Sequence, residues 1–344
     1  MLFGSSLIRE RVLEHEQRGG GFFLPRTGDF YLGALEGLAF ASLRLFAMNL
    51  DTLETKARSD PLRDMVRDLD LHPDDTVLAG CTWKRVFAFE PGSLLIKGRV
   101  ERLGEGNACL AFDRAGDHVV VGSNLRQSVK VVDAERWLLS STKRVGQATQ
   151  IVQGTDPHEF VLLHGPTGRV VWFDSDQGRA THEIRTPPFG DAVLTEKTIL
   201  LATGDPRPLA SIPASLAGVL PATRGNSPVP GYLPMAGSEM VTVASGIAAV
   251  DTQARSLAGQ TPSPRLGPMP YRMLQADVSG DSVFLLSDGW VRSFEPRLQK
   301  VRWEWRLPEG SFPLAVMANG ERAVVSFGRW AWSRIALAER HGQR

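Results

Sequence analysis

The sequence predicts an all-β protein built from a repeated unit of four short strands. Short apolar runs alternate with turn residues, an acidic residue closes one run in almost every unit, and the unit recurs about every forty residues. Four short strands in a unit of this length, with turns between them, are typical of a blade of a β-propeller. Because a blade cannot bury both of its faces alone, we expect the units to stack around a common axis.

The acidic residue that closes one strand in each unit marks the repeat. Asp133 ends the run "VKVVD", for example, and Asp174 ends the run "RVVWFD". The other markers are Asp51, Glu90, Asp251, Glu295 and Glu339. We expect each of these carboxylates to accept hydrogen bonds from backbone N–H groups in the tight turn that follows it.

The spacing of the markers predicts the number of units. Neighbouring markers lie 39 to 44 residues apart, except Asp174 and Asp251, which lie 77 apart. Since 77 is close to twice the other intervals, we expect a unit without a marker at the weak match "PRPLASIPAS" (206–215). Residues 1–344 are therefore predicted to form a single β-propeller domain of eight four-stranded blades, with seven blades as the alternative.

The strands follow the same order in each unit. An inner strand such as "NACLAF" comes first, then a strongly apolar strand such as "HVVVGS", the marker strand and a more polar outer strand. The stretch "DPLRDMVRDLD" (60–70) differs from this pattern. Asp60 as an N-cap, Pro61 at the first helical position and helically spaced apolar residues predict a turn or two of helix there. A run straight into an inner strand is the alternative.

The two ends of the chain are expected to meet in the last unit. That unit runs out near Arg344, before an outer strand could form. The N-terminal stretch "SLIRERVLE" resembles "SLLIKGRVE", an outer strand of the second unit. Residues 1–18 are therefore predicted to supply the missing outer strand and to remove an open edge. A short amphipathic helix is the alternative, because Leu, Arg and Glu are good helix formers.

Composition limits the partners that the chain is expected to have. The 39 basic and 38 acidic residues leave a net charge of +1, without the basic excess that binding to nucleic-acid phosphates requires. The N-terminus has no secretory pattern, and no apolar run approaches the roughly 20 residues of a membrane helix. Cys81 and Cys109 lie in apolar runs, so we expect buried free thiols. These features predict a soluble cytoplasmic protein that binds neither nucleic acid nor membrane.

Residues 287–308, "SDGWVRSFEPRLQKVRWEWRLP", resemble the repeat of quinoprotein-like propellers of the PQQ type or the outer-membrane-assembly lipoprotein type. In that family a strand ends in Asp, a Thr-Gly turn follows, and a Trp comes eight residues after the Asp. Here Trp303 follows Glu295 by eight residues, and Gly178 matches the turn glycine after Asp174. The other units match this motif, or that of a WD40-like repeat, only loosely. The resemblance implies an eight-bladed ring.

The resemblance carries no cofactor over to this chain. The redox members of the family bind their quinone with a vicinal disulfide, a calcium site and a tryptophan platform. Cys81 and Cys109 lie 28 residues apart and cannot be vicinal. We therefore expect no cofactor.

The first candidate metal ligands are two histidines in equivalent turns of neighbouring units. Asp74 and Asp75 lie beside His72, and Asp117 lies beside His118. These residues would form a metal site if the two turns converge. Ordinary turn chemistry is the simpler explanation, because any β-turn favours polar residues.

A second pair of histidines, His158 and His164, flanks the strand "EFVLL" with an even separation, so that both could face one side. Only Asp156 and Glu159 lie near them in the sequence. The chain contains no spaced metal motif, nucleophile elbow or phosphate-binding loop. No residue is therefore assigned as catalytic, metal-ligating or cofactor-binding.

Two features favour a protein partner. Residues 204–237 hold seven prolines and few charges, and form either a degenerate blade with long loops or a stiff docking loop. Trp330 and Trp332 share a strand face, where packing between blades explains them most simply. If they were exposed with the neighbouring arginines, they would have the composition of an interface hot spot. The candidate partner-binding residues are Trp330, Trp332, Arg329, Arg334, Pro206, Arg207, Arg224, Pro228 and Pro230.

We expect the protein to be a non-catalytic scaffold or adaptor that presents loops to a protein partner within a larger complex. The alternative is an enzyme or a small-ligand sensor, lactonase-like or quinoprotein-like, with a site at the central channel. A scaffold should expose apolar or aromatic patches. An enzyme should gather three or more carboxylates or histidines at the channel, typically around an ion. The fold alone cannot decide between them, because propellers host both functions.

Overall fold

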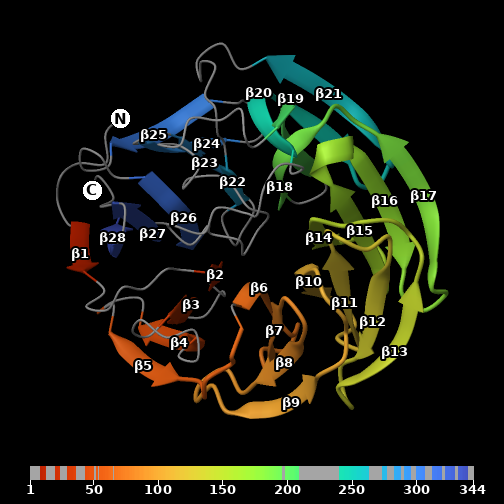
Figure 1. Ribbon diagram of the computed structural model, residues 1–344. Coiled ribbons are helices and arrows are strands. Elements are labelled where there is room, and N and C mark those ends of the chain that lie inside the picture. The colour runs from red at the N-terminus through yellow and green to blue at the C-terminus, as the bar shows by residue number, and fades with distance from the viewer. Residues whose placement is uncertain are drawn as a thin grey trace.

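The structure is a computed structural model that describes residues 54–64, 66–195, 198–208 and 240–262, and otherwise separate strands towards the two ends. The described residues form 28 strands and one short 3-10 helix, Gly165–Thr167. These strands make seven four-stranded antiparallel sheets, which confirms an all-β, propeller-like fold of repeated units. The sheets are arranged around a centre, and the first strand of each sheet lies nearest to it (Figure 1).

Six sheets consist of four strands that follow one another along the chain. Three of them contain β2 (Gly20–Phe23), β3 (Asp29–Leu35), β4 (Leu43–Asn49) and β5 (Thr55–Arg58); β6 (Val66–Leu71), β7 (Leu78–Thr82), β8 (Val86–Phe89) and β9 (Ile96–Val100); and β10 (Asn107–Phe112), β11 (His118–Ser123), β12 (Val129–Asp133) and β13 (Leu138–Lys143). The other three contain β14 (Gln150–Gln153), β15 (Glu159–His164), β16 (Arg169–Asp174) and β17 (Arg179–Arg185); β18 (Phe189–Thr195), β19 (Thr198–Pro208), β20 (Met240–Asp251) and β21 (Ser256–Pro262); and β22 (Met273–Ala276), β23 (Val283–Ser287), β24 (Trp290–Glu295) and β25 (Lys300–Arg306).

The seventh sheet joins the two ends of the chain. It contains β26 (Phe312–Asn319), β27 (Arg322–Arg329), β28 (Trp332–Glu339) and β1 (Ile8–Val12). β1 runs antiparallel to β28, with Ile8 opposite Ala338 and Val12 opposite Arg334. The N-terminal segment therefore forms the fourth strand of the last sheet, as its likeness to an outer strand predicted, and not a helix.

The predicted acidic markers lie where the third strand of a sheet ends. β12, β16, β20, β24 and β28 end on their marker, and β8 ends one residue before Glu90, while Asp51 lies outside the described residues. Asp133 Oδ1 accepts the backbone N–H groups of Glu135 (3.0 Å) and Arg136 (2.7 Å). Asp251 Oδ1 does the same for the N–H groups of Gln253 and Ala254. With the bond from the Gln177 N–H to Asp174 Oδ1, these bonds confirm the turn capping for the three described aspartates. The Glu90 side chain accepts the Ser93 hydroxyl instead of a backbone N–H.

The long interval between two markers belongs to a single described sheet. β19 and β20 pair from Thr198 opposite Asp251 to Pro208 opposite Met240, so the start of the Pro-rich stretch extends a hairpin. Residues 206–208 of the predicted eighth unit (206–215) belong to β19 and so do not form a separate sheet. Residues 209–239 lie outside the described residues. The seven described sheets equal the number of markers.

The predicted helix at 60–70 was wrong, and the alternative of an inner strand is confirmed. β6 begins at Val66, directly pairs with β7, and has Val66 and Leu69 buried. Residues 60–64 contain no helix, and Arg63 has a φ of 57°, which a right-handed helix cannot contain. Tertiary pairing with β7 outweighs the local helical spacing here.

The core lies between neighbouring sheets. One buried cluster joins residues of β7 and β8 to residues of β10 and β11, among them Ala79, Phe112 and Val119. Cys81 and Cys109 are fully buried free thiols, as expected, and burial raises the pKa of each well above its ordinary value. No helix among the described residues has the length and apolar character that a membrane crossing needs.

Candidate functional site

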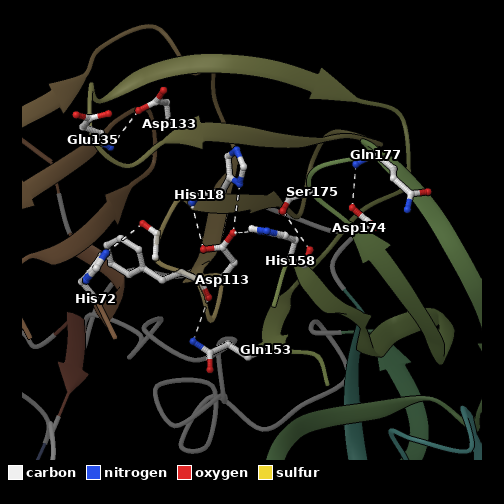
Figure 2. Close-up of polar contacts among 12 residues, drawn as sticks. His72, Asp113, His118, Asp133, Glu135, Gln153, His158, Asp174, Ser175 and Gln177 are labelled. Atoms are coloured by element: carbon white, nitrogen blue, oxygen red, sulfur yellow. Dashed lines mark hydrogen bonds and ion pairs between the residues drawn. The ribbon is translucent and has the colours of Figure 1, made fainter. Parts of the chain in front are cut away.

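A buried aspartate and two histidines converge where two neighbouring sheets meet (Figure 2). Asp113 follows β10 directly, and its side chain has no solvent exposure. Its Oδ2 atom lies 3.2 Å from Nδ1 of His118, the first residue of β11, and 2.9 Å from Nδ1 of His158, which precedes β15 in the next sheet. One carboxylate oxygen therefore contacts imidazole nitrogens from two sheets.

Backbone hydrogen bonds fix this cluster on both sides. Asp113 donates its N–H to the carbonyl oxygen of His118 (3.0 Å), and its Oδ1 atom accepts the N–H of His118 (3.2 Å). The carbonyl oxygen of His158 accepts both the N–H (3.0 Å) and the hydroxyl (3.1 Å) of Ser175, and the N–H of Arg114 bonds Pro157. The three side chains are thus held by turns that are themselves cross-linked.

The electrostatics of the cluster favour positive charge next to Asp113. The hydrogen bond that His158 donates to Asp113 raises the pKa of His158, and the negative charges of Asp113, Asp176 and Asp117 add to this effect, against the opposing effect of burial. The His118 and His158 rings meet edge to face with centroids 5.9 Å apart. A buried carboxylate with two imidazoles can transfer protons or bind a divalent cation.

Of the predicted histidine pairs, only one member of each belongs to this cluster. His72 contacts the same turn as His118, but through the carbonyl oxygen of Gly116, which lies 3.1 Å from its Nε2 atom. Its Nδ1 atom contacts Asp74 instead. His164 lies at the far end of β15 from His158, and its Nδ1 atom is 2.7 Å from the Thr167 hydroxyl. The cluster therefore combines one histidine from each of the two considered pairs, and neither pair occurs as a unit in it.

Sequence reasoning missed Asp113, the residue that both histidines share. Asp113 opens the turn "DRAGDH", and in the two neighbouring sheets the first turn position holds His72 and Gly154. No sequence signal singles out Asp113, because its Oδ1 atom also accepts the N–H of His118, as a turn aspartate commonly does. Among the described residues, this is the only group of three potential metal ligands whose donor atoms all lie within 4.8 Å of one another.

Further polar contacts on the same face link the next pair of sheets. Glu159, at the start of β15, is almost fully buried, and its Oε1 atom lies 2.5 Å from Nη2 of Arg255 in the turn between β20 and β21. The carbonyl oxygen of Arg255 lies 3.1 Å from Nε2 of His182. The turns of this face thus tie neighbouring sheets together by buried and half-buried polar bonds.

A cationic groove of about 710 Å³ lies between the segment that follows β13 and the outer strand β17. Its charged lining consists of Lys143, Arg144, Arg169, Arg179, Arg185 and a single carboxylate, Glu183. Glu183 pairs with Arg169 (2.8 Å) and Arg185 (3.2 Å). Within the described part of the chain, no carboxylate lies within ion-pair distance of Lys143 or Arg144, so the groove keeps an excess of positive charge. His164 also lines it, and burial together with Arg169 and Arg185 lowers the pKa of this histidine.

The predicted partner-binding residues are placed only in part. Arg329 ends β27 and lies opposite Trp332, the first residue of β28, while Arg334 lies opposite Phe327. Pro206 and Arg207 belong to β19 and lie opposite Thr242 and Val241. These two groups therefore come from different sheets. Trp330, Arg224, Pro228 and Pro230 lie outside the described residues.

The chain matches no known protein-family model and none of the curated proteins with which it was compared. The likeness of residues 287–308 to a quinoprotein-like repeat therefore stays an expectation.

Proposed function

We propose that this protein is a non-catalytic scaffold, built on a β-propeller of seven blades that β1 closes, and that it docks an acidic segment of a protein partner in the cationic groove. Three observations support the ring. Seven four-stranded sheets are described, β1 pairs with β28, and the first strands of consecutive sheets contact one another from β2 and β6 round to β26 and β2.

The groove is the observation that carries the docking proposal. It gathers five cationic side chains and one carboxylate in a chain whose net charge is only +1, so the positive charge is a local feature. Arg144, Arg179 and Arg185 are exposed, and Lys143 is half-buried. Complementary charge of this kind raises the rate and the specificity of association with an acidic partner.

The edge of β17 favours an extended peptide over a compact anion. β17 is the last strand in its sheet, so its outer edge has no strand partner among the described residues. An extended segment can add to such an edge through main-chain hydrogen bonds while its side chains reach neighbouring pockets. Here acidic side chains would meet Arg179 and Arg185 along the strand and Arg144 across the groove.

The aspartate–histidine cluster favours a second candidate function, an enzyme or a small-ligand sensor. Asp113, His118 and His158 meet the criterion of three carboxylates or histidines within a few ångströms. The turns that hold them connect the first two strands of their sheets, which lie in the inner part of the ring (Figure 1). The scaffold is the preferred proposal because the groove presents five cationic side chains to a partner, whereas the cluster presents three polar side chains.

A charge-reversal experiment tests the docking proposal. The purified full chain is titrated with a fluorescent ten-residue oligoglutamate peptide, an uncharged oligoglutamine peptide and a short oligonucleotide. Arg144→Glu should weaken oligoglutamate binding at least tenfold, because it places a negative charge at the mouth of the groove. Arg136→Glu is the matched control, since this exposed arginine lies in the β12–β13 turn, outside the groove.

The outcomes separate the partner classes. Selective binding of oligoglutamate that Arg144→Glu abolishes and Arg136→Glu preserves supports the scaffold with an acidic partner. Equal sensitivity of both variants would mean that the overall charge acts and not the groove. Tighter binding of the oligonucleotide would replace the protein partner by a nucleic acid and overturn the proposal.

A further inference from the structure

We propose that Asp113, His118 and His158 bind one divalent transition-metal ion, zinc by its coordination preference. The donor atoms are Oδ2 of Asp113 and Nδ1 of each histidine, at O···N distances of 3.2 Å and 2.9 Å. In a tetrahedral zinc site with bonds of 2.0–2.1 Å, neighbouring ligand atoms lie about 3.3 Å apart. The spacing of the two nitrogens from the carboxylate oxygen is close to that value, and all three atoms lie within 4.8 Å of one another.

The chemistry of the donors suits zinc better than a harder cation. Zinc accepts a mixed set of two imidazoles and one carboxylate in open sites, whereas calcium and magnesium prefer oxygen ligands alone. Asp113 is fully buried, so its carboxylate has no water to compete with a cation. Its other oxygen already accepts the N–H of His118, which orients Oδ2 towards the two nitrogens.

The surrounding structure holds the ligands in place and leaves access to them. The hydrogen bonds of Asp113 and Ser175 described above fix the backbone on both sides of the cluster. The side chains of His118 and His158 keep 23% and 31% of their surface exposed, so the cluster borders on solvent. Three protein ligands leave a fourth coordination position for water or for a group of a partner, as in zinc sites that are not purely structural.

The metal would join two sheets, because Asp113 and His118 belong to one sheet and His158 to the next. Loss of a single histidine should therefore weaken both metal binding and the stabilisation that the metal confers. This inference goes beyond the scaffold function and does not depend on it, since the groove shares no residue with the cluster.

Metal titration of the full chain tests the site. After dialysis against a chelator, the protein is titrated with Zn²⁺ by calorimetry and with Co²⁺ by visible absorption, which reports tetrahedral coordination. The wild type should bind one equivalent of each ion, and His158→Gln should lower the affinity at least tenfold. His182→Gln is the matched control. His182 lies on β17 of the sheet that contains β15 and contacts Arg255 of the next sheet, so its loss should leave metal binding unchanged.

Asp113→Asn serves as a second variant. Because Asp113 is buried, this substitution can disturb folding, and circular dichroism and thermal unfolding therefore accompany every measurement. The proposal is overturned if the wild type binds no stoichiometric metal, or if folded His158→Gln binds with wild-type affinity. Binding of the ion without the tetrahedral Co²⁺ spectrum would overturn the assigned ligand set. None of these results changes the expected effect of Arg144→Glu on peptide binding, so the two proposals fail separately.

Discussion

The indole of Trp137 lies directly over Gly98 of the neighbouring sheet. A Cβ atom at position 98 would lie 2.6 Å from both Cγ and Cδ1 of this ring. Trp137 ends the turn after Asp133 with a φ of 54°, and 7% of its surface is exposed. The turn that the marker aspartate caps therefore delivers an aromatic side chain to the next sheet, where only glycine leaves room for it.

The first prediction concerns this contact. Gly98→Ala should lower the free energy of unfolding by about 1–3 kcal/mol, because the ring must move away from a packed position. Gly259→Ala is the matched control, because Gly98 and Gly259 both lie on fourth strands, opposite Ala88 and Ala249. Among the described residues, no atom lies within 4 Å of a Cβ added at position 259. The control should change stability by no more than about 0.5 kcal/mol in urea unfolding. Equal effects of the two variants would contradict the contact.

The second prediction concerns the marker carboxylates. Asp133→Ala removes the acceptor of the Glu135 and Arg136 N–H groups, so the free energy of unfolding should fall by about 1 kcal/mol. Asp133→Asn keeps a side-chain oxygen at the same place and should lose less than half as much. Thermal denaturation of both variants measures the difference. If Asn were as damaging as Ala, charge rather than hydrogen bonding to the turn would be responsible.

The third prediction concerns the pH dependence of stability. Lys130 has 3% of its surface exposed and donates from Nζ to Oδ1 of Asn107. Burial, with a contribution from the nearby positive charge of Arg126, lowers its pKa to about 8. Because the unfolded chain keeps a lysine pKa of about 10.4, the unfolded state binds more protons between these values, and stability should rise as the pH increases from 8 to 10.

Lys130→Met tests this pH dependence. At pH 7 the variant should be more stable than the wild type by about 2 kcal/mol, since it removes the cost of a buried ammonium group. The advantage should shrink as the pH approaches 10, because the wild-type lysine is then neutral when folded. Urea unfolding at pH 7, 8.5 and 10 measures the difference. A constant difference across this range would show that Lys130 does not titrate in the folded protein.

The fourth prediction concerns the bond between Glu159 and Arg255. The Glu159 side chain is 4% exposed, so Arg255→Ala leaves a buried carboxylate without its cation and should destabilise the protein by about 3 kcal/mol. Lys84→Ala breaks the exposed pair with Glu105 and should leave the stability almost unchanged, because solvent screens this pair. Adding Glu159→Gln to Arg255→Ala should recover part of the loss. Additive losses in this double-mutant cycle would mean that the two groups do not interact.

Local chemistry made much of the strand pattern predictable. Alternating apolar residues and turn residues located β10 to β12, and the acidic markers located the ends of third strands. Side-chain alternation along a strand and hydrogen bonding in a turn both act within a few residues, so the sequence reveals them. The likeness of "SLIRERVLE" to an outer strand also led to β1 and its place beside β28. The helix expected at 60–70 failed because pairing of β6 with β7 outweighs local helical spacing.

Contacts between distant parts of the chain were not predictable in the same way. Asp113 and His158 lie 45 residues apart, and they meet only because two sheets pack side by side. The groove likewise combines the segment after β13 with the outer strand of the next sheet. Neither the contact between Asp113 and His158 nor the groove corresponds to a fixed residue spacing that a sequence motif could describe.

The sequence by itself determined the all-β class, the repeated four-stranded unit and the turn chemistry of its acidic markers, because hydrogen bonding and side-chain alternation within one unit are local. The tertiary structure alone decided which turns face each other across sheets, that β19 and β20 extend one hairpin instead of starting another unit over residues 206–208, and that a buried carboxylate gathers two histidines. Those outcomes depend on how neighbouring sheets pack. Packing buries and pairs side chains that lie far apart in the sequence, and no local pattern connects such residues.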